Sequence, residues 1–395
     1  MADGDLLVRG IGRLLTMANG VVDGPAAVVI RDGRVAWTGR EAELPGQREL
    51  PSYDADGAAV VPGFVDPHTH LVWAGSRREE FVARLAGQPY DGGGIRTTVA
   101  ATRTASADEL VGLALSRVRA MQANGTTTVE AKTGYGLSAD DELRLLDVLR
   151  AVAERTPVQI ELTYLGAHVV PAGRERSAYV DEVVATLPAA AEHGAQWCDV
   201  FCDVGAFDIE ETRRILAAAR DAGLGLRLHA EQLARTGAAA LAAEVGCASA
   251  DHLERITEDD ARALAEAGVV GVLLPTAALS VRDPHREHVD RLRRAGVRLA
   301  LATDCNPGTS WCESMPFAIQ VGCLEFGLTV AEAFAAATSG GAAALRRTDI
   351  GQVAIGARGD LAVLAAEHEA DLVAHLGARP VSVTVIGGVP WLADA

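Results

Sequence analysis

The sequence contains only one lysine, Lys132, and it has 36 basic residues against 53 acidic ones. The formal net charge of −17 argues against a nucleic-acid partner and against an anionic membrane partner, because both require a basic surface. Aromatic residues are scarce, at 4% of the chain. Hydrophobic residues of all kinds nevertheless make up 49%, which is ample for a large core. Beyond these points, the acidic composition mostly indicates solubility.

Other familiar signals are missing as well. The six cysteines show no paired zinc-type spacing, and in a chain of 395 residues we expect reduced thiols rather than a disulfide framework. The segment Met1–Asp5 is acidic and is not followed by the basic and apolar regions of a signal peptide. No uninterrupted apolar stretch is long enough to span a bilayer. These features predict a soluble, cytoplasmic protein.

Both ends of the chain carry short β-type runs separated by turn signals. Asp32-Gly33 between two such runs is a strong hairpin signal. Neither end alone has enough strands for a stable sheet, so we expect residues 1–60 and 349–395 to form one small β-sandwich domain. Residues 61–348 are then a domain inserted between its halves. The runs are Leu6–Arg9, Ala26–Arg31, Val35–Thr38, Asp360–Leu364 and Val381–Ile386.

The middle of the chain alternates strand-like and helix-like segments, a rhythm typical of parallel strands with helical crossovers. Eight such units fit a (β/α)₈ TIM-type barrel, with an open doubly wound sheet as the alternative. Glycines such as Gly125 and Gly223 follow the helical stretches, as at helix C-termini. The strand candidates are Val60–Val65, Thr126–Ala131, Val158–Leu165, Cys198–Asp203, Leu224–Leu228, Ala248–Asp251, Val269–Leu274 and Val297–Ala302.

A His-X-His pair follows the first of these strands. Strand side chains alternate between faces, so His68 and His70 project the same way, about 6.6–6.8 Å apart along the backbone. Two imidazoles at that spacing can bind one metal ion from the same side. The alternative is a pair of histidines that caps a turn, and the pair alone does not decide between them.

Further polar residues end other strands, where catalytic groups of a barrel gather. Five of the ten histidines lie at such ends: His68, His70, His168, His229 and His252. With Asp304 after the eighth strand, His68, His70 and His229 make a set of three nitrogens and one oxygen that suits Zn²⁺ or Fe²⁺ and leaves a position for water. The fourth strand ends without a lysine or glutamate that could bridge two ions, so we predict one metal. The minor alternative is Asp203 as a ligand of a second ion.

The chemistry expected of this set is metal-assisted hydrolysis of a carbon–nitrogen bond. Asp304 is placed to accept a proton from water, and His252 to polarise a carbonyl or shuttle a proton. The alternative for His252 is a core histidine bonded to Asp251. Lys132 alternates onto one strand face with Glu130, and it is either a required compact ammonium or half of a structural ion pair.

Six segments, in order through almost the whole barrel region, resemble the imidazolonepropionases of the amidohydrolase superfamily. The His-X-His pair is typical of the superfamily, whereas the Lys-Thr-Gly-Tyr-Gly-Leu and Asp-Cys-Asn-Pro-Gly-Thr motifs are far more specific. The β-rich ends likewise resemble the composite sandwich of that superfamily. The segments are Pro62–Phe81, Gly125–Leu137, Tyr164–Pro171, His229–Gln232, Ser249–Leu253 and Ala302–Ser310.

The resemblance implies ring opening of 4-imidazolone-5-propanoate to N-formimidoyl-L-glutamate in histidine degradation. It implies iron or zinc on His68, His70, His229 and Asp304. It also implies a substrate site of Arg77, Tyr135, His168, Asn306, Gly308 and Thr309. A propanoate tail independently calls for a cation, and Arg77 offers a two-pronged donor. Without the motif, Arg77 would be interpreted as part of a solvated run of charges.

One position departs from part of the family. Gln232 stands three residues after His229, where some members carry glutamate; an amide can orient water or substrate but cannot carry a proton. That leaves more of the proton transfer to Asp304 and His252. The alternatives are another mononuclear aminohydrolase, such as a guanine or cytosine deaminase, and a catalytically silent binding protein. The sequence does not determine the oligomeric state; dimers are common among proteins of this kind, which makes a homodimer one candidate.

Overall fold

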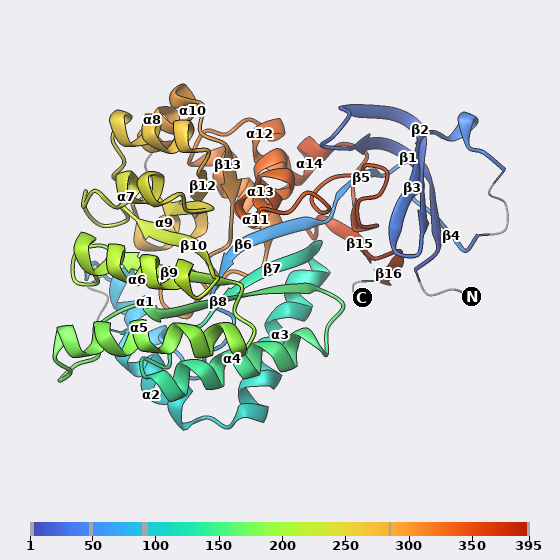
Figure 1. Cartoon of the computed structure of the whole chain (residues 1–395). Helices are drawn as coiled ribbons and strands as arrows, with labels where there is room; N and C mark the ends of the chain where they lie inside the picture. The colour runs from blue at the N-terminus through green and yellow to red at the C-terminus, as the bar shows by residue number, and fades with distance from the viewer. Residues whose placement is uncertain (1–3, 47–49, 89–93, 284–285, 393–395) are drawn as a thin grey trace.

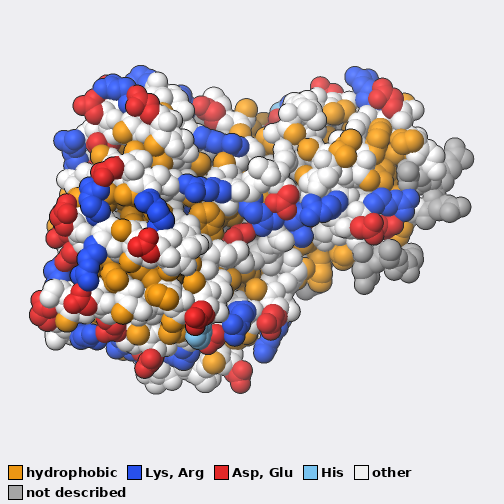
Figure 2. Space-filling model, in the orientation of Figure 1, with side chains coloured by type: hydrophobic (Ala, Val, Ile, Leu, Met, Phe, Trp, Pro, Cys, Tyr) orange, Lys and Arg blue, Asp and Glu red, His pale blue; other side chains and the backbone are white. Residues whose placement is uncertain are grey.

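The chain forms a large barrel with a smaller sheet beside it, and both chain ends lie at the smaller sheet (Figure 1). The structure is a computed structural model that describes residues 4–46, 50–88, 94–283 and 286–392. The surface face in Figure 2 carries basic and acidic side chains interspersed over the barrel helices. Ion pairs join exposed side chains of the barrel region, for example Arg214 and Asp181 at 2.5 Å.

Eight parallel strands form the barrel, in the sequential order β6 to β13. A bridge between Thr69 and Cys305 and a backbone hydrogen bond from His70 N to Cys305 O (2.9 Å) join the last strand segment back to the first. The predicted (β/α)₈ barrel is therefore confirmed, and the doubly wound alternative is wrong. The strands are β6 (Phe64–Thr69), β7 (Thr126–Lys132), β8 (Gln159–Ala167), β9 (Trp197–Cys202), β10 (Gly225–Ala230), β11 (Ser249–His252), β12 (Val270–Leu273) and β13 (Leu299–Leu301).

The helices around the barrel begin at residues whose side chains satisfy free backbone N–H groups. Ser106 and Ser138 cap α3 and α4, and Asp208 makes a capping box with Glu211 at the start of α6. Among the described residues no helix is both long and apolar enough to cross a membrane. The helices are α1 (Arg78–Leu85), α2 (Ile95–Thr104), α3 (Ala107–Ala123), α4 (Ala139–Ala153), α5 (Arg176–Glu192), α6 (Ile209–Asp221), α7 (Ala238–Val245), α8 (Glu258–Ala267), α9 (Pro275–Val281), α10 (Glu287–Ala295), α11 (Met315–Leu324), α12 (Val330–Ala335), the π-helix η2 (Ala336–Gly340) and α13 (Gly341–Ala344).

The smaller sheet combines the two ends of the chain in the order β16-β15-β14-β5-β1-β2-β3, with β4 paired to β1. The ends meet where β5 lies between β1 and β14. Side chains such as Leu6, Val28, Leu361 and Val383 share one buried core. The elements are β1 (Leu6–Leu15), β2 (Val21–Arg31), β3 (Arg34–Arg40), η1 (Glu41–Glu43), β4 (Ser52–Asp54), β5 (Ala59–Pro62), β14 (Leu361–Leu364), α14 (Glu369–Ala374), β15 (Val381–Ile386) and β16 (Val389–Leu392).

One strand prediction needs correction. The apolar run Val60–Val65 is not a single barrel strand, because it divides at Gly63 into β5 of the smaller sheet and the start of β6 in the barrel. A Cβ at Gly63 would lie 2.3 Å from Thr127 Oγ1, so the chain can pass here only without a side chain. The same covalent segment therefore links the smaller sheet to the strand that carries His68.

Candidate active site at the carboxyl ends of the barrel strands

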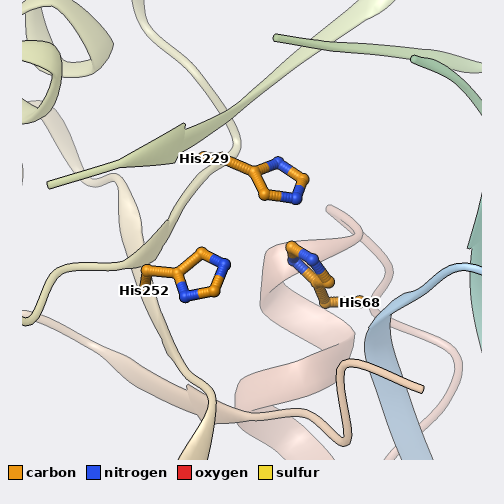
Figure 3. Close-up of side chains that lie close together, drawn as sticks. All are labelled: His68, His229 and His252. Atoms are coloured by element: carbon orange, nitrogen blue, oxygen red, sulfur yellow. The ribbon is translucent and has the colours of Figure 1, made fainter. Parts of the chain in front are cut away.

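Three imidazoles from β6, β10 and β11 point toward a common centre (Figure 3). The ring centroids of His68 and His229 are 4.4 Å apart, and that of His252 lies 5.7 Å from His68 and 5.5 Å from His229. Asp304 Oδ1 lies 3.6 Å from Nε2 of both His68 and His70. Ligand atoms of His68, His70 and Asp304 all lie within 4.8 Å of one another, and so do those of His68, His229 and His252. His68 therefore joins two overlapping groups, which together contain the four predicted ligands and His252.

The donor atoms fit a metal ion. Nδ1 of His68 donates to Asp251 Oδ2 at 2.6 Å, and Nδ1 of His229 lies 3.0 Å from Asp199 Oδ2. Nε2 of His68 is buried and has no hydrogen-bond partner among the described residues. Burial holds the pKa of His68 and of His70 well below the usual range, so both rings are neutral. Neutral imidazoles backed by carboxylates are the arrangement in which proteins hold divalent metals.

The partner expected for His252 is different in the structure. Asp251 bonds His68, so the interpretation of His252 as a core histidine bonded to Asp251 is wrong. Nδ1 of His252 instead lies 3.7 Å from Glu254 Oε1. Burial lowers the pKa of His252, but Glu254 and Asp304 raise it by more, and the net shift is upward. Sequence reasoning missed Glu254, which follows His252 by two residues on the same short segment.

A cluster of buried charges lies beneath the histidines. Lys132 Nζ lies 2.7 Å from Asp199 Oδ2, 2.8 Å from Glu130 Oε1 and 3.9 Å from Asp251 Oδ2. Arg227 reaches Asp251 at 3.5 Å. The predicted Lys132–Glu130 ion pair is therefore present, but it belongs to a larger network. Asp199 and Arg227 were not predicted; the available signal was a charged residue inside an otherwise apolar barrel strand.

Unusual backbone conformations gather at this rim. Leu137, Glu231, His252, Leu253 and Asp304 all have positive φ values, between 49° and 79°, without being glycine. Such conformations cost free energy and persist where the surroundings fix them, as they do at many functional sites. At His252 and Asp304 the strained residues are themselves members of the histidine–aspartate cluster.

A cavity of about 590 Å³ opens above the cluster. It is large enough for a small ligand and combines polar groups with apolar walls. Its lining includes most of the predicted site: His70, Arg77, Tyr135, His168, His229, Gln232, His252, Asp304, Asn306 and Thr309. His68 and Gly308 are not among the lining residues: His68 is fully buried within the cluster, and Gly308 packs against the guanidinium of Arg77.

Arg77 is a buried residue of the cavity wall. Its Nε and Nη2 each donate to Glu80 at 2.8 Å, while the neighbouring Arg78 is exposed. The interpretation of Arg77 as part of a solvated charge run is therefore wrong. A Cβ on Gly308 would lie 2.2 Å from Arg77 Nη1, so a larger residue at this position would displace the guanidinium from its present place.

Tyr135 sits in a loop that one carboxylate organises. Glu142 at the start of α4 accepts hydrogen bonds from the backbone N–H groups of Gly134 (2.8 Å), Gly136 (2.7 Å) and Leu137 (2.7 Å). The Tyr135 ring lies 5.8 Å from that of His70, centroid to centroid. Glu142 was missed because a first-turn acidic residue of a helix is ordinarily a surface group.

Replacing Glu142 by glutamine is expected to destabilise the protein by about 1–3 kcal/mol, because one of its two acceptor oxygens becomes a donor facing buried N–H groups. Chemical denaturation measures the change. Asp140→Asn, at an exposed position two residues earlier, is the matched control and should cost at most about 1 kcal/mol. Equal effects of the two substitutions would contradict the role given to Glu142.

His168 and Asn306 shape the wall on either side of the cluster. His168 stacks on His70 with centroids 5.2 Å apart, and burial lowers its pKa to about 4. Asn306 Oδ1 accepts from the N–H groups of Gly308 and Thr309, both at 2.8 Å, and its Nδ2 donates to Asp304 O at 2.7 Å. The side chain of Asn306 thus holds the loop that presents Asp304.

Two nearby carboxylates face away from the centre. Both oxygens of Asp203 accept from backbone N–H groups, from Leu233 at 2.8 Å and from Val204 at 2.7 Å. Asp203 therefore anchors the loop after β10, and the two-metal alternative has no support. Glu231 accepts a hydrogen bond from Gly237 N at 2.8 Å, at the start of α7. Of the adjacent residues Glu231 and Gln232, it is therefore Gln232 that faces the cavity.

Comparison with known proteins agrees with this geometry. The model of the amidohydrolase family matches residues 59–390. The imidazolonepropionase of Salinispora arenicola is 48% identical and covers 98% of both chains, and that of Mycolicibacterium smegmatis is 44% identical over 98% of this chain and 95% of its own. The chain belongs to the imidazolonepropionases of the amidohydrolase family.

Solved structures of amidohydrolase-type enzymes share the fold. An atrazine chlorohydrolase variant from Arthrobacter aurescens, complexed with zinc and atraton, has a TM-score of 0.77 at 16% identity, covering 98% of this chain and 95% of its own. An adenosine deaminase from Xanthomonas campestris with bound zinc has a TM-score of 0.75 at 19% identity, covering 98% and 93%. Family membership and the histidine–aspartate cluster together indicate a divalent metal in this chain.

Proposed function

We propose that this chain hydrolyses the cyclic amide of 4-imidazolone-5-propanoate to N-formimidoyl-L-glutamate, a step of histidine degradation. The observation that carries the proposal is one cavity with two kinds of group. It contains a histidine–aspartate cluster for hydrolysis and a buried arginine, Arg77, for a carboxylate tail. The names of the full-length relatives support the same substrate.

His68, His70, His229 and Asp304 would hold one divalent ion, zinc or iron. When bound, such an ion acts as a Lewis acid on a carbonyl oxygen and makes water more acidic. The protein supplies the binding geometry: Asp251 fixes the orientation of His68 through a hydrogen bond to its Nδ1, and Asp199 lies 3.0 Å from Nδ1 of His229.

The proton transfers fall to residues of the chain. Asp304 accepts a proton from the water whose oxygen bonds to the ring carbonyl carbon. His252, with Glu254 beside it, polarises the carbonyl oxygen and delivers a proton to the ring nitrogen as the carbon–nitrogen bond breaks. Gln232 orients water or substrate, because its amide cannot carry a proton. Tyr135, His168 and Thr309 form the walls around the ring.

Arg77→Ala is expected to raise KM for the propanoate substrate by about 10–100-fold, because a charge-assisted hydrogen bond to the tail is worth about 1.5–3 kcal/mol. The metal content of the Arg77→Ala variant should equal that of the unaltered protein. Arg78→Ala removes an exposed neighbouring charge and is the matched control. If Arg77→Ala loses metal as strongly as it loses substrate affinity, Arg77 is not a substrate-binding residue.

Purified, metal-replete protein assayed with imidazolone propanoate, guanine and cytosine tests the proposal. We expect turnover of the first substrate alone. Ammonia release from guanine or cytosine would identify a deaminase, and no turnover of any substrate would identify a silent binding protein.

Metal analysis of protein purified without chelators distinguishes iron from zinc. A cytoplasmic location and a homodimer remain predictions; sedimentation measures the latter.

A further inference from the structure

Lys132 is fully buried beneath the histidine cluster, at the end of β7. Its ammonium contacts Asp199 at 2.7 Å and lies 3.9 Å from Asp251. Each of these carboxylates in turn contacts one histidine. Asp251 Oδ2 accepts from Nδ1 of His68 at 2.6 Å, while Asp199 accepts from the backbone N–H of His229 at 3.2 Å and lies 3.0 Å from its Nδ1. One cation therefore joins two separate carboxylate–histidine pairs, which come from four different strands.

Counted as ionised, the carboxylates around Lys132 and Asp304 outnumber the neighbouring cations, apart from the His252–Glu254 pair. Asp199, Asp251 and Glu130 in the network, with Asp304 above it, supply four negative charges, and Lys132 and Arg227 supply two positive ones. The formal charge of these six side chains is then −2. Since buried charge is costly without compensation, a divalent ion held by the histidines and Asp304 would offset it.

Two roles for Lys132 follow from this geometry, and they have opposite consequences. A cation that only offsets charge repels a metal ion, so its removal should tighten metal binding. A cation that aligns the two carboxylates supports metal binding, so its removal should weaken it. The compact ammonium has three donors and fits among three carboxylates in a space where a planar guanidinium would be larger and less adaptable.

We propose that Lys132 is a positioning residue: its ammonium aligns the carboxylates of Asp199 and Asp251, and through them sets the imidazoles of His229 and His68. The inference rests on the proposed metal site. In this role Lys132 acts on the metal-binding histidines, which is different from forming an ion pair with Glu130 and different from contacting substrate. Lys132 is not among the residues that line the cavity, so its effect on substrate is indirect.

Zinc affinity of the metal-free Lys132→Met variant tests the proposal. We expect the Kd for Zn²⁺, measured by chelator competition, to rise by about 10–100-fold. The Co²⁺ absorption spectrum should change as well. Arg347→Met is the control. It removes a cation that pairs with Glu161 near the start of β8, away from the carboxyl ends of the strands, and it should bind zinc with the Kd of the unaltered protein. Equal or tighter zinc binding by Lys132→Met would overturn the inference.

A second measurement needs no variant and covers the case in which Lys132→Met does not fold. Because the chain has one lysine, protein made with lysine labelled by ¹⁵N at Nζ gives a single side-chain signal. We expect this signal to shift as one equivalent of Zn²⁺ is added. Binding of zinc without a shift overturns the role of Lys132, whereas the absence of zinc binding overturns the proposed metal site itself.

Discussion

Asp304→Asn is expected to lower kcat by about 10²–10⁴-fold, the contribution of a well-placed proton acceptor. Asp304 combines two tasks, since its Oδ1 lies 3.6 Å from Nε2 of both His68 and His70 and its carboxylate faces the cavity. Asparagine preserves the size of the side chain but is neutral and cannot accept the proton from water. The rate is measured with saturating imidazolone propanoate and with the metal content of each sample determined.

Asp360→Asn is the control for this experiment. Asp360 is also a buried aspartate, but it lies directly before β14 of the smaller sheet and pairs with Arg358 at 2.9 Å. The substitution should reduce stability without changing kcat per folded molecule. If metal-replete Asp304→Asn keeps kcat within about tenfold of the unaltered protein, Asp304 does not carry the proton transfer assigned to it.

Removing the metal is expected to abolish turnover and also to destabilise the fold. At a free metal concentration of about 100 times Kd, binding contributes about 2.7 kcal/mol of stability, which is lost on chelation. The loss has a local cause, because the carboxylates around Lys132 and Asp304 then remain with an uncompensated negative charge. Calorimetry with and without chelator, followed by a rate assay, measures both effects.

Adding back Zn²⁺ and Fe²⁺ separately completes the experiment. Recovery of both melting temperature and turnover with one of the ions identifies an effective cofactor. Mg²⁺ serves as the control, because a site with three imidazoles disfavours an ion that prefers oxygen ligands. Full turnover in the chelated, metal-free protein would contradict the proposed mechanism, whatever the effect on stability.

The barrel and the composite sheet could be predicted because they depend on local patterns. Alternation of strand and helix needs a parallel sheet, and the hairpin signal at Asp32-Gly33 gives the turn between β2 and β3. His68, His229 and Asp304 could be placed together because strand ends of a barrel share one rim. The division at Gly63 could not be predicted, because it depends on the close approach of Thr127 from the neighbouring strand.

The partners of the buried charged residues beneath the histidines could not be predicted from the sequence, for a different reason. Adjacent residues such as Asp251 and His252 both lie at the rim, yet Asp251 bonds His68 on β6 and His252 lies near Glu254. Which neighbour a buried carboxylate meets depends on strand register and on side-chain direction around the whole barrel. Composition did point to one of these residues: the single lysine, Lys132, is buried among the carboxylates beneath the histidines.

The position of β5 has a consequence for synthesis of the chain. β5 needs β14 as its neighbour, and roughly 300 residues separate them, so at about 5–20 residues per second the ribosome takes roughly 15–60 s to supply the partner strand. During that interval one edge of β5 is open to other chains. β5 is covalently continuous with β6, the strand that carries His68. A chain truncated before β14, or many chains synthesised close together, should therefore aggregate before the metal site has formed.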